Sequence, residues 1–98
     1  LVQGTGGEGF RDAVNEHWLP ALDRFRPQLI LVSAGFDAHQ ADAMAGLNFV
    51  DADYAWVTEA LVAVAEVHAD GRLVSSLEGG YDLHALARSV EAHLKALL

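Results

Sequence analysis

The spacing of apolar residues along the chain predicts a first helix near the start. Between Phe10 and Phe25, apolar side chains recur every three or four positions, which is the period of one helix face. Pro20 lies inside this segment, and proline removes a backbone hydrogen bond and clashes with the preceding turn. We therefore expect a kink or a break into two short helices near residues 18–19.

The helical period returns in two later segments. The first begins near Asp51 or Asp53, either of which can cap a helix, and ends at Gly71, a residue type common just past helix ends. The second follows Asp82, another capping residue, and continues to residue 97. These segments predict the second and third helices.

Two short apolar runs without helical period predict strands. Residues 28–34 and 72–77 are rich in aliphatic side chains, as in strands buried in parallel sheets. A strand–helix–strand unit crosses over right-handed and pairs in parallel, so both strands should end at the same edge of the sheet. The loop 35–49 and the exit turn 78–81 then lie at the edge where ligands bind in open α/β sheets. The sequence leaves open whether the two strands are neighbours.

Length and composition indicate part of a larger domain. The 98 residues make at most one domain, and the hydrophobic fraction of 52% exceeds what a small soluble domain needs. A two-stranded parallel sheet is not self-sufficient, because such sheets are normally covered on both faces. We expect an α/β fold in which residues 1–98 form the C-terminal helix–strand–helix–strand–helix part of a doubly wound parallel-sheet domain.

Charge and cysteine content narrow the function classes. The formal net charge is −8 and the six Lys and Arg residues are scattered, so we expect no direct nucleic-acid ligand. Nothing predicts a membrane span, because no run of about 18 apolar residues occurs. Without cysteine there is neither a disulfide nor a thiolate zinc site; the compartment stays open, and we expect a cytoplasmic protein.

The most informative side chains follow the two strands directly. Asp37 comes after the first strand, where it is either a turn cap or an oxygen ligand for a divalent metal such as zinc. Tyr81 follows two glycines after the second strand, and a phenol there can hydrogen-bond a carbonyl oxygen that becomes an oxyanion. One carboxylate cannot hold a catalytic zinc, so two further protein ligands are needed.

Other candidates for chemistry are weaker. His39 has a supporting role beside a metal or a simple surface position, and Asp42 becomes a second metal ligand only if its loop curls back. The remaining histidines lie in predicted helices. The segment Gly4-Thr5-Gly6-Gly7-Glu8-Gly9 satisfies a dinucleotide-binding spacing, but no strand precedes it, so a turn leading into the first helix is the better account.

Three motifs closely resemble the C-terminal portion of class II-type histone deacetylases and bacterial histone deacetylase-like amidohydrolases. They are Ser33-Ala34-Gly35-Phe36-Asp37-Ala38-His39, Ala41-Asp42-Ala43-Met44-Ala45-Gly46-Leu47 and Leu77-Glu78-Gly79-Gly80-Tyr81-Asp82-Leu83. The resemblance extends over essentially the whole chain, including residues 4–6, 18–22 and 25–27. It implies a zinc-dependent amide hydrolase of the arginase/deacetylase fold.

The resemblance also assigns roles to individual residues. Asp37 matches a zinc ligand, and Tyr81 matches the tyrosine that polarises the scissile carbonyl. Gly79 and Gly80 match the glycine wall of the acyl-lysine tunnel, and Met44 matches a position at the tunnel mouth. The implied substrate is an acylated lysine or a polyamine-type amine, with Met44 favouring acyl-lysine or a small neutral amide. Self-association into a homo-oligomer stays open.

The departures from the family pattern are equally specific. Ala43 stands where relatives usually have proline, which should loosen the loop. The family's Asp-x-Asp-x-His-His type motif and its paired histidines for acid and base work do not occur in the sequence, and by resemblance they lie upstream. We therefore expect the isolated chain to be inactive. The alternatives are an arginase-like or acetylpolyamine metallohydrolase, and a non-catalytic α/β module that binds a partner.

Overall fold

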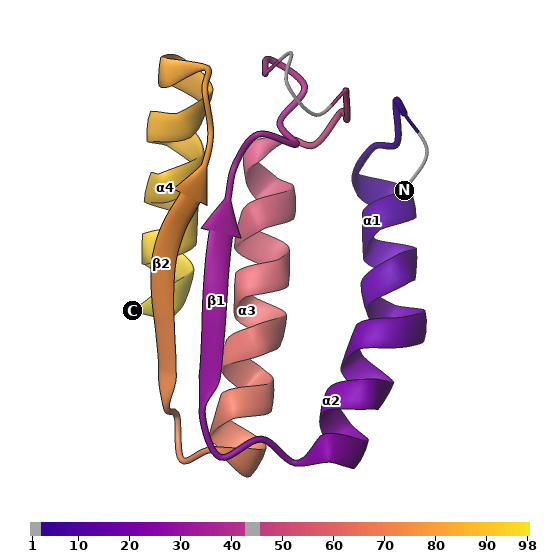
Figure 1. Cartoon of the computed structure of the whole chain (residues 1–98), viewed down its shortest axis with the longest axis vertical. Coiled ribbons are helices and arrows are strands. Elements are labelled where there is room, and N and C mark those ends of the chain that lie inside the picture. The colour runs from indigo at the N-terminus through magenta and orange to yellow at the C-terminus, as the bar shows by residue number, and fades with distance from the viewer. Residues whose placement is uncertain (1–2, 43–45) are drawn as a thin grey trace.

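A computed structural model describes residues 3–42 and 46–98 and has the expected order of elements (Figure 1). The helices and strands are α1 (Gly7–Ala13), the π-helical turn η1 (Val14–Trp18), α2 (Leu19–Phe25), β1 (Ile30–Gly35), α3 (Asp51–His68), β2 (Leu73–Gly79) and α4 (Leu83–Leu97). The α/β fold class predicted from the sequence is confirmed. No helix of the described residues has the length and apolarity needed to cross a membrane.

The break expected at Pro20 takes the form of a π-helical turn. Proline cannot donate the backbone hydrogen bond of a regular helix, and the turn before it widens so that the Leu19 N–H donates to the Val14 carbonyl. α2 then begins at Leu19 and ends where Arg26 adopts a left-handed φ of 56°. The predicted helix is thus three short helical segments in line.

β1 and β2 are neighbours and run parallel. Ile30 pairs with Leu73 and Ala34 with Leu77, and the pairing then shifts so that Gly35 lies opposite Gly79. Glu78 is the extra residue of a β-bulge, which bends the strand and re-aims the chain beyond it. The sequence-based end of the second strand at residue 77 was therefore two residues short, because the bulge keeps residues 78 and 79 in the ladder.

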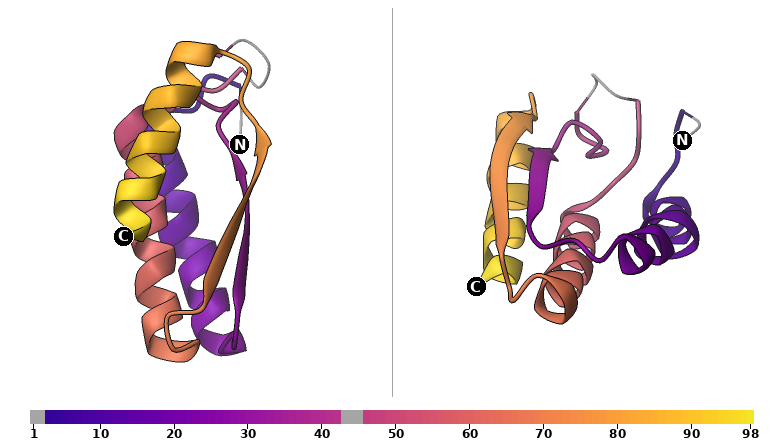
Figure 2. Two further views of the ribbon diagram at one scale, coloured as in Figure 1. Left: turned by 90° about the vertical axis from the view of Figure 1, so that its left-hand side faces the viewer. Right: turned by 60° about the horizontal axis from the view of Figure 1, so that its bottom comes forward.

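All the helices lie on one face of this sheet, as the two further views show (Figure 2). The core between helices and sheet is aromatic at the end where the strands terminate: the Phe10 and Phe49 rings lie 4.4 Å apart, and Phe36 lies 5.0 Å from Tyr54. This packing fixes the loop that follows β1 against α1 and α3.

A buried histidine joins α4 to the rest of the fold. His93 is 7% exposed, and burial lowers its pKa. Thr58 donates to the Tyr54 carbonyl, so its oxygen accepts from Nδ1 of His93 at 2.7 Å, and the Ser75 hydroxyl donates to Nε2 at 2.8 Å. The neutral imidazole thereby ties α4 to α3 and β2; the sequence predicted this histidine in a helix, and the structure shows that it is buried there.

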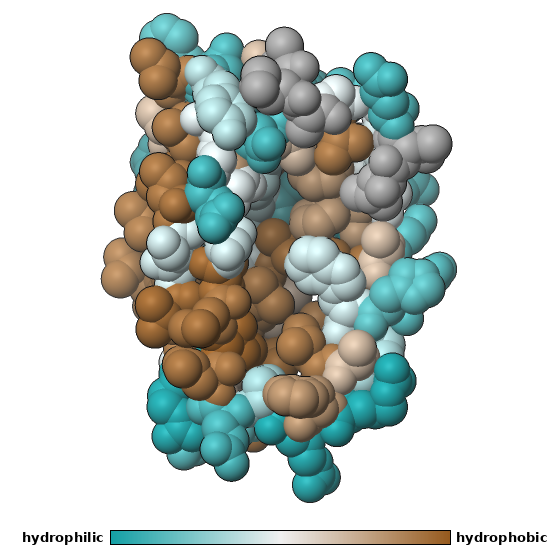
Figure 3. All heavy atoms as spheres, viewed as in Figure 1, coloured by the Kyte–Doolittle hydropathy of each residue, from teal (hydrophilic) through white to brown (hydrophobic). Residues whose placement is uncertain are grey.

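Among the described residues no helix covers the opposite face of the sheet, and this face is apolar toward the start of the strands. Leu31 and Val74, on β1 and β2, are 72% and 56% exposed, and Leu29 and Phe25 extend the patch (Figure 3). A hollow of about 610 Å³ between α2 and β1 continues this surface. Patches of this kind mark surfaces that meet other protein. The excess of apolar residues noted in the sequence is located here.

The glycine-rich segment before α1 packs against side chains. A Cβ added at Gly7 would lie 2.6 Å from the carboxylate carbon of Asp53, which also accepts from the Val50 N–H at 2.9 Å. A carboxylate at this place disfavours the phosphate of a dinucleotide. The segment is a turn into the first helix, as the sequence favoured.

Candidate functional site

The ends of β1 and β2 form a small hollow that holds both side chains selected from the sequence. Its volume is about 270 Å³. It is lined by Ser33, Gly35, Asp37, Glu78, Gly79 and Tyr81. Parallel pairing of adjacent strands therefore brings a carboxylate and a phenol together from positions 44 residues apart in the sequence (81 − 37 = 44).

Gly79 lies between these two groups. A methyl group placed on its Cα would be 3.6 Å from Cγ of Asp37 and 3.7 Å from the Tyr81 hydroxyl oxygen. Both groups thus lie close to the same point of the backbone. Since Gly79 has no side chain, the space between carboxylate and phenol stays open to a ligand.

Gly80 is needed for the backbone turn that follows β2 and not for the open space of the hollow. Its φ is +134°, a conformation that residues with a side chain rarely adopt, and an added Cβ would lie 2.7 Å from Leu86 Cδ1 and 3.2 Å from Phe36 Cβ. The backbone therefore packs tightly on the core while it reverses into Tyr81. Two adjacent glycines are needed here for two different physical reasons.

These two reasons predict different outcomes for two alanine substitutions. Gly79→Ala makes only ordinary van der Waals contacts, so we expect a folded protein of nearly unchanged stability with a partly filled hollow. Gly80→Ala meets both a strained φ and a clash with Leu86, so we expect a loss of about 2 kcal/mol in unfolding free energy. Urea unfolding measures the unfolding free energy of both variants. Equal losses in the two variants would contradict the different roles assigned to Gly79 and Gly80.

Within the described part of the chain, the Asp37 carboxylate accepts no hydrogen bond. A turn cap would accept one from a nearby backbone N–H. The carboxylate instead lines the hollow beside Gly35 and Gly79, with Oδ1 3.4 Å from a Cβ placed on Gly35. Of the two interpretations left open by the sequence, this geometry favours the ligand.

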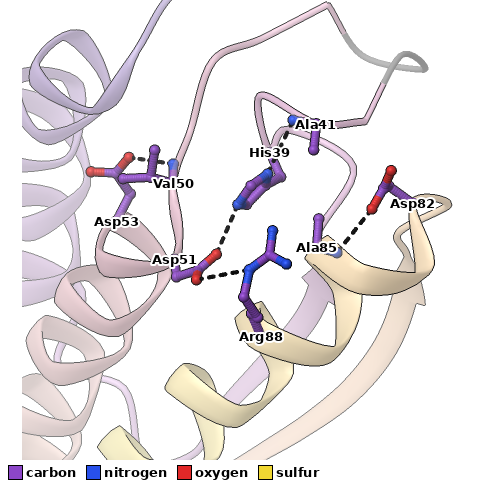
Figure 4. Close-up of polar contacts among 8 residues, drawn as sticks. All are labelled: His39, Ala41, Val50, Asp51, Asp53, Asp82, Ala85 and Arg88. Carbon is purple, nitrogen blue, oxygen red and sulfur yellow. Dashed lines mark hydrogen bonds and ion pairs between the residues drawn. The ribbon is translucent and has the colours of Figure 1, made fainter.

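His39 lies in the interior, so the surface position considered for it is wrong. It is 3% exposed, and its Nδ1 accepts from the Ala41 N–H at 3.1 Å. Nε2 therefore carries the proton and donates to Asp51 at 2.8 Å (Figure 4). Asp51 also contacts Arg88 at 3.3 Å. These contacts fix the loop after β1 to the start of α3 and to α4.

Asp42 holds the loop after β1 to the turn that bears Tyr81. It is 4% exposed, and its Oδ2 accepts from the backbone N–H groups of Tyr81 at 2.6 Å and Asp82 at 2.8 Å. Asp82 in turn caps α4 by accepting from the Ala85 N–H at 2.9 Å, as the sequence predicted. The role of Asp42 was not predicted; the sequence suggested only a second metal ligand at this position.

Tyr54 is a second phenol near the site that the sequence did not single out. Its ring packs on Phe36, and its pKa is raised above the ordinary value by burial and, to a lesser extent, by the negative charge of Asp37. The phenol therefore stays protonated at neutral pH. In the sequence, Tyr54 lies among the apolar residues of the predicted helix, and this pattern is typical of an ordinary aromatic residue of the core.

The described residues bring two carboxylates to the lining of this hollow, those of Asp37 and Glu78. Among residues 3–42 and 46–98, no three or more His, Cys, Asp or Glu side chains are grouped to hold a metal ion. A carboxylate oxygen is a ligand that zinc accepts, so Asp37 fits the role of one ligand of several. Met44, matched to the tunnel mouth, lies outside the described residues.

Comparison with known proteins identifies the family. The histone deacetylase domain family matches residues 1–97. The chain belongs to the histone deacetylase family. It is 42% identical over its whole length to histone deacetylase 10, chloroplastic, of Oryza sativa subsp. japonica, of which it spans 22%. It is 43% identical over 83% of its length to a histone deacetylase-like amidohydrolase of Pseudomonas aeruginosa, of which it spans 21%.

The fold of this histone deacetylase segment agrees with that of a solved relative. The structure of the histone deacetylase Clr3 superposes with a TM-score of 0.88 and 32% identity, over 98% of this chain and 16% of that one. The resemblance noted in the sequence motifs is thus confirmed at the level of the family and of the fold. In each of these three comparisons the segment is about a fifth of the relative's length or less.

Proposed function

We propose that this chain forms part of a zinc-dependent deacetylase that removes acetyl or related acyl groups from an amine. The observation that supports it is the placement of the Asp37 carboxylate and the Tyr81 hydroxyl next to Gly79 in one hollow, at the ends of adjacent parallel strands. The membership of the histone deacetylase family gives this geometry its reaction class.

Asp37 is the residue of this chain that would hold zinc. When bound, zinc supplies a Lewis acid and lowers the pKa of a water molecule in its open position. The remaining ligands and the histidine base come from residues outside this chain. The bare apolar face of the sheet supports this, because Leu31 and Val74 need a covering layer that other parts of the protein can supply.

Tyr81 polarises the scissile carbonyl in this proposal. Its side chain is 59% exposed, so the hydroxyl is accessible to a substrate that enters the hollow. A phenol donates a hydrogen bond that strengthens as the carbonyl oxygen gains negative charge, and it therefore stabilises the transition state more than the substrate. Gly79 and Gly80 form the adjacent wall.

The substrate we propose is an acylated lysine or a polyamine-type amine. The net charge of −8 suits a carrier that is cationic around the acylated position. The names of the relatives concern deacetylases and amidohydrolases, which supports an amide of this kind. A cytoplasmic location and a homo-oligomer remain part of the proposal.

Zinc removal tests the proposal. In the protein that contains this chain, we expect a chelator to abolish hydrolysis of an acetyl-lysine peptide and stoichiometric zinc to restore it. We expect the isolated 98-residue chain to show no zinc-dependent turnover, since its described residues contain no group of three or more side chains that could hold a metal ion. Hydrolysis that persists in the presence of the chelator would overturn the zinc dependence. If the protein showed no hydrolysis at all but bound a partner protein, the non-catalytic module would be favoured.

The arginase-like alternative has lost its support. It needs a second metal-binding carboxylate near Asp37, and Asp42 was the candidate. The Asp42 carboxylate oxygen Oδ2 instead accepts from two backbone N–H groups at the Tyr81 turn. Among residues 3–42 and 46–98, no group of three or more His, Cys, Asp or Glu side chains supports a two-metal site.

A further inference from the structure

Tyr81 needs support that its own side chain does not provide. The ring is 59% exposed, so packing does not fix its direction. The residue before it, Gly80, has a φ of +134°, a region in which glycine is less restricted than other residues. A small rotation of the Tyr81 backbone is amplified at the hydroxyl, and a misplacement of about 1 Å at a reacting centre can cost about 100-fold in rate.

Asp42 supplies the missing support through the backbone. One carboxylate oxygen, Oδ2, accepts from two successive N–H groups, those of Tyr81 and Asp82, at 2.6 and 2.8 Å. Hydrogen bonds from N–H groups to an ionised carboxylate are stronger than bonds between neutral groups. These two N–H groups belong to the peptide planes on either side of the Tyr81 Cα, so the two bonds fix both planes and hence the direction in which the Tyr81 side chain leaves the backbone.

The acceptor is itself held by the loop that carries Asp37. The Asp42 N–H donates to the His39 carbonyl at 2.9 Å, and the His39 ring is fixed by Asp51 at 2.8 Å. On the other side of the loop, the Phe36 N–H donates to the Gly79 carbonyl at 2.8 Å. The carboxylate proposed to bind zinc and the acceptor of the Tyr81 amide thus belong to one rigid loop.

We propose that Asp42 is a positioning residue that sets the place of the Tyr81 hydroxyl relative to the Asp37 carboxylate. It touches neither substrate nor zinc and acts through two backbone amides. The inference rests on the proposed function for its effect on catalysis, and on the hydrogen bonds alone for its effect on the Tyr81 turn.

Kinetics of Asp42→Ala and Asp42→Asn in the protein that contains this chain test the catalytic part. We expect Asp42→Ala to lower kcat by about 10- to 100-fold, with KM and zinc content within about twofold. Asp42→Asn keeps one oxygen acceptor, so a smaller loss is expected. In a Tyr81→Phe background the loss from Asp42→Ala should shrink to about threefold or less, because there is no hydroxyl left to position.

Asp53→Asn is the matched control. Asp53 is also buried, at 3% exposure, and also accepts from a backbone N–H, that of Val50, but it points to the opposite side of α3 (Figure 4). We expect this variant to lower stability and leave kcat unchanged where the protein is folded. Equal kcat losses in the Asp42 and Asp53 variants would overturn the proposal in favour of general destabilisation.

Amide hydrogen exchange tests the structural part without activity. Asp42→Ala should speed the exchange of the Tyr81 and Asp82 amides by at least about 10-fold, while the amide of Leu86, which donates to the Asp82 carbonyl, changes less. An unchanged exchange rate of the Tyr81 amide would overturn the positioning role. So would a double variant, Asp42→Ala with Tyr81→Phe, whose loss of kcat equals the product of the two single losses. If Tyr81→Phe alone leaves turnover intact, the proposed function fails, and the exchange result still decides this inference.

Discussion

Replacing Tyr81 by phenylalanine in the protein that contains this chain is expected to lower kcat by about 100- to 1,000-fold, which is typical for loss of an oxyanion donor. The hydroxyl lies at the open hollow beside Gly79 and the ring is 59% exposed, so the fold does not depend on it. Steady-state hydrolysis of an acetyl-lysine peptide, with zinc measured by atomic absorption, checks the result. Zinc content should stay unchanged.

Leu83→Ala is a suitable control for the Tyr81 variant. Leu83 is the first residue of α4, two positions after Tyr81, and is 78% exposed, but it has no hydrogen-bond donor in its side chain. We expect its turnover to remain within about twofold of the parent protein. An unchanged kcat in Tyr81→Phe would refute the proposed role of the phenol, and a parallel loss of zinc would assign Tyr81 to the structure of the site.

Replacing Asp37 by alanine is expected to abolish both zinc binding and turnover. The carboxylate lines the hollow and, among the described residues, accepts no hydrogen bond, so its loss should cost little folding stability. Removing one of about three protein ligands lowers zinc affinity steeply. Zinc stoichiometry after dialysis, together with the thermal midpoint in the presence of a chelator, measures the two effects separately.

Glu78→Gln is the control that distinguishes direct zinc ligation by Asp37 from a general effect of negative charge on zinc binding. Glu78 lines the same hollow and also carries a negative charge, but it is the exposed extra residue of the bulge. We expect the Glu78 variant to retain zinc and the Asp37 variant to lose it. If Asp37→Ala retained zinc and became markedly less stable, Asp37 would be a turn cap rather than a ligand.

The helices and strands were predictable because their signals are local. The period between Phe10 and Phe25, the capping residue Asp82 and the effect of Pro20 all depend on neighbours within one or two turns. The bulge at Glu78 was not predicted, because strand pairing across the sheet decides it and the apolar run does not.

The chemical groups of the site were predictable from the sequence, but the hydrogen bonds that hold them in place were not. Asp37 and Tyr81 follow strands that end at one edge, and this topology alone brings them together. The anchors Asp42 and His39 lie in a loop without period, where no pattern predicts a partner. Asp42 accepts hydrogen bonds from two N–H groups that follow it in the sequence by 39 and 40 positions, so only the folded structure shows these bonds.

The bulge makes the two strand ends unequal in length. Asp37 follows Ala34 by three positions, whereas Tyr81 follows Leu77, the partner of Ala34, by four. Deleting Glu78 would leave Gly79 opposite Gly35 in a regular ladder, but it would remove the bend that the bulge gives to β2 and shorten the path to Tyr81 by one residue. A single-residue insertion or deletion at this edge therefore changes the place of the Tyr81 side chain relative to Asp37, even where every side chain of the hollow is kept.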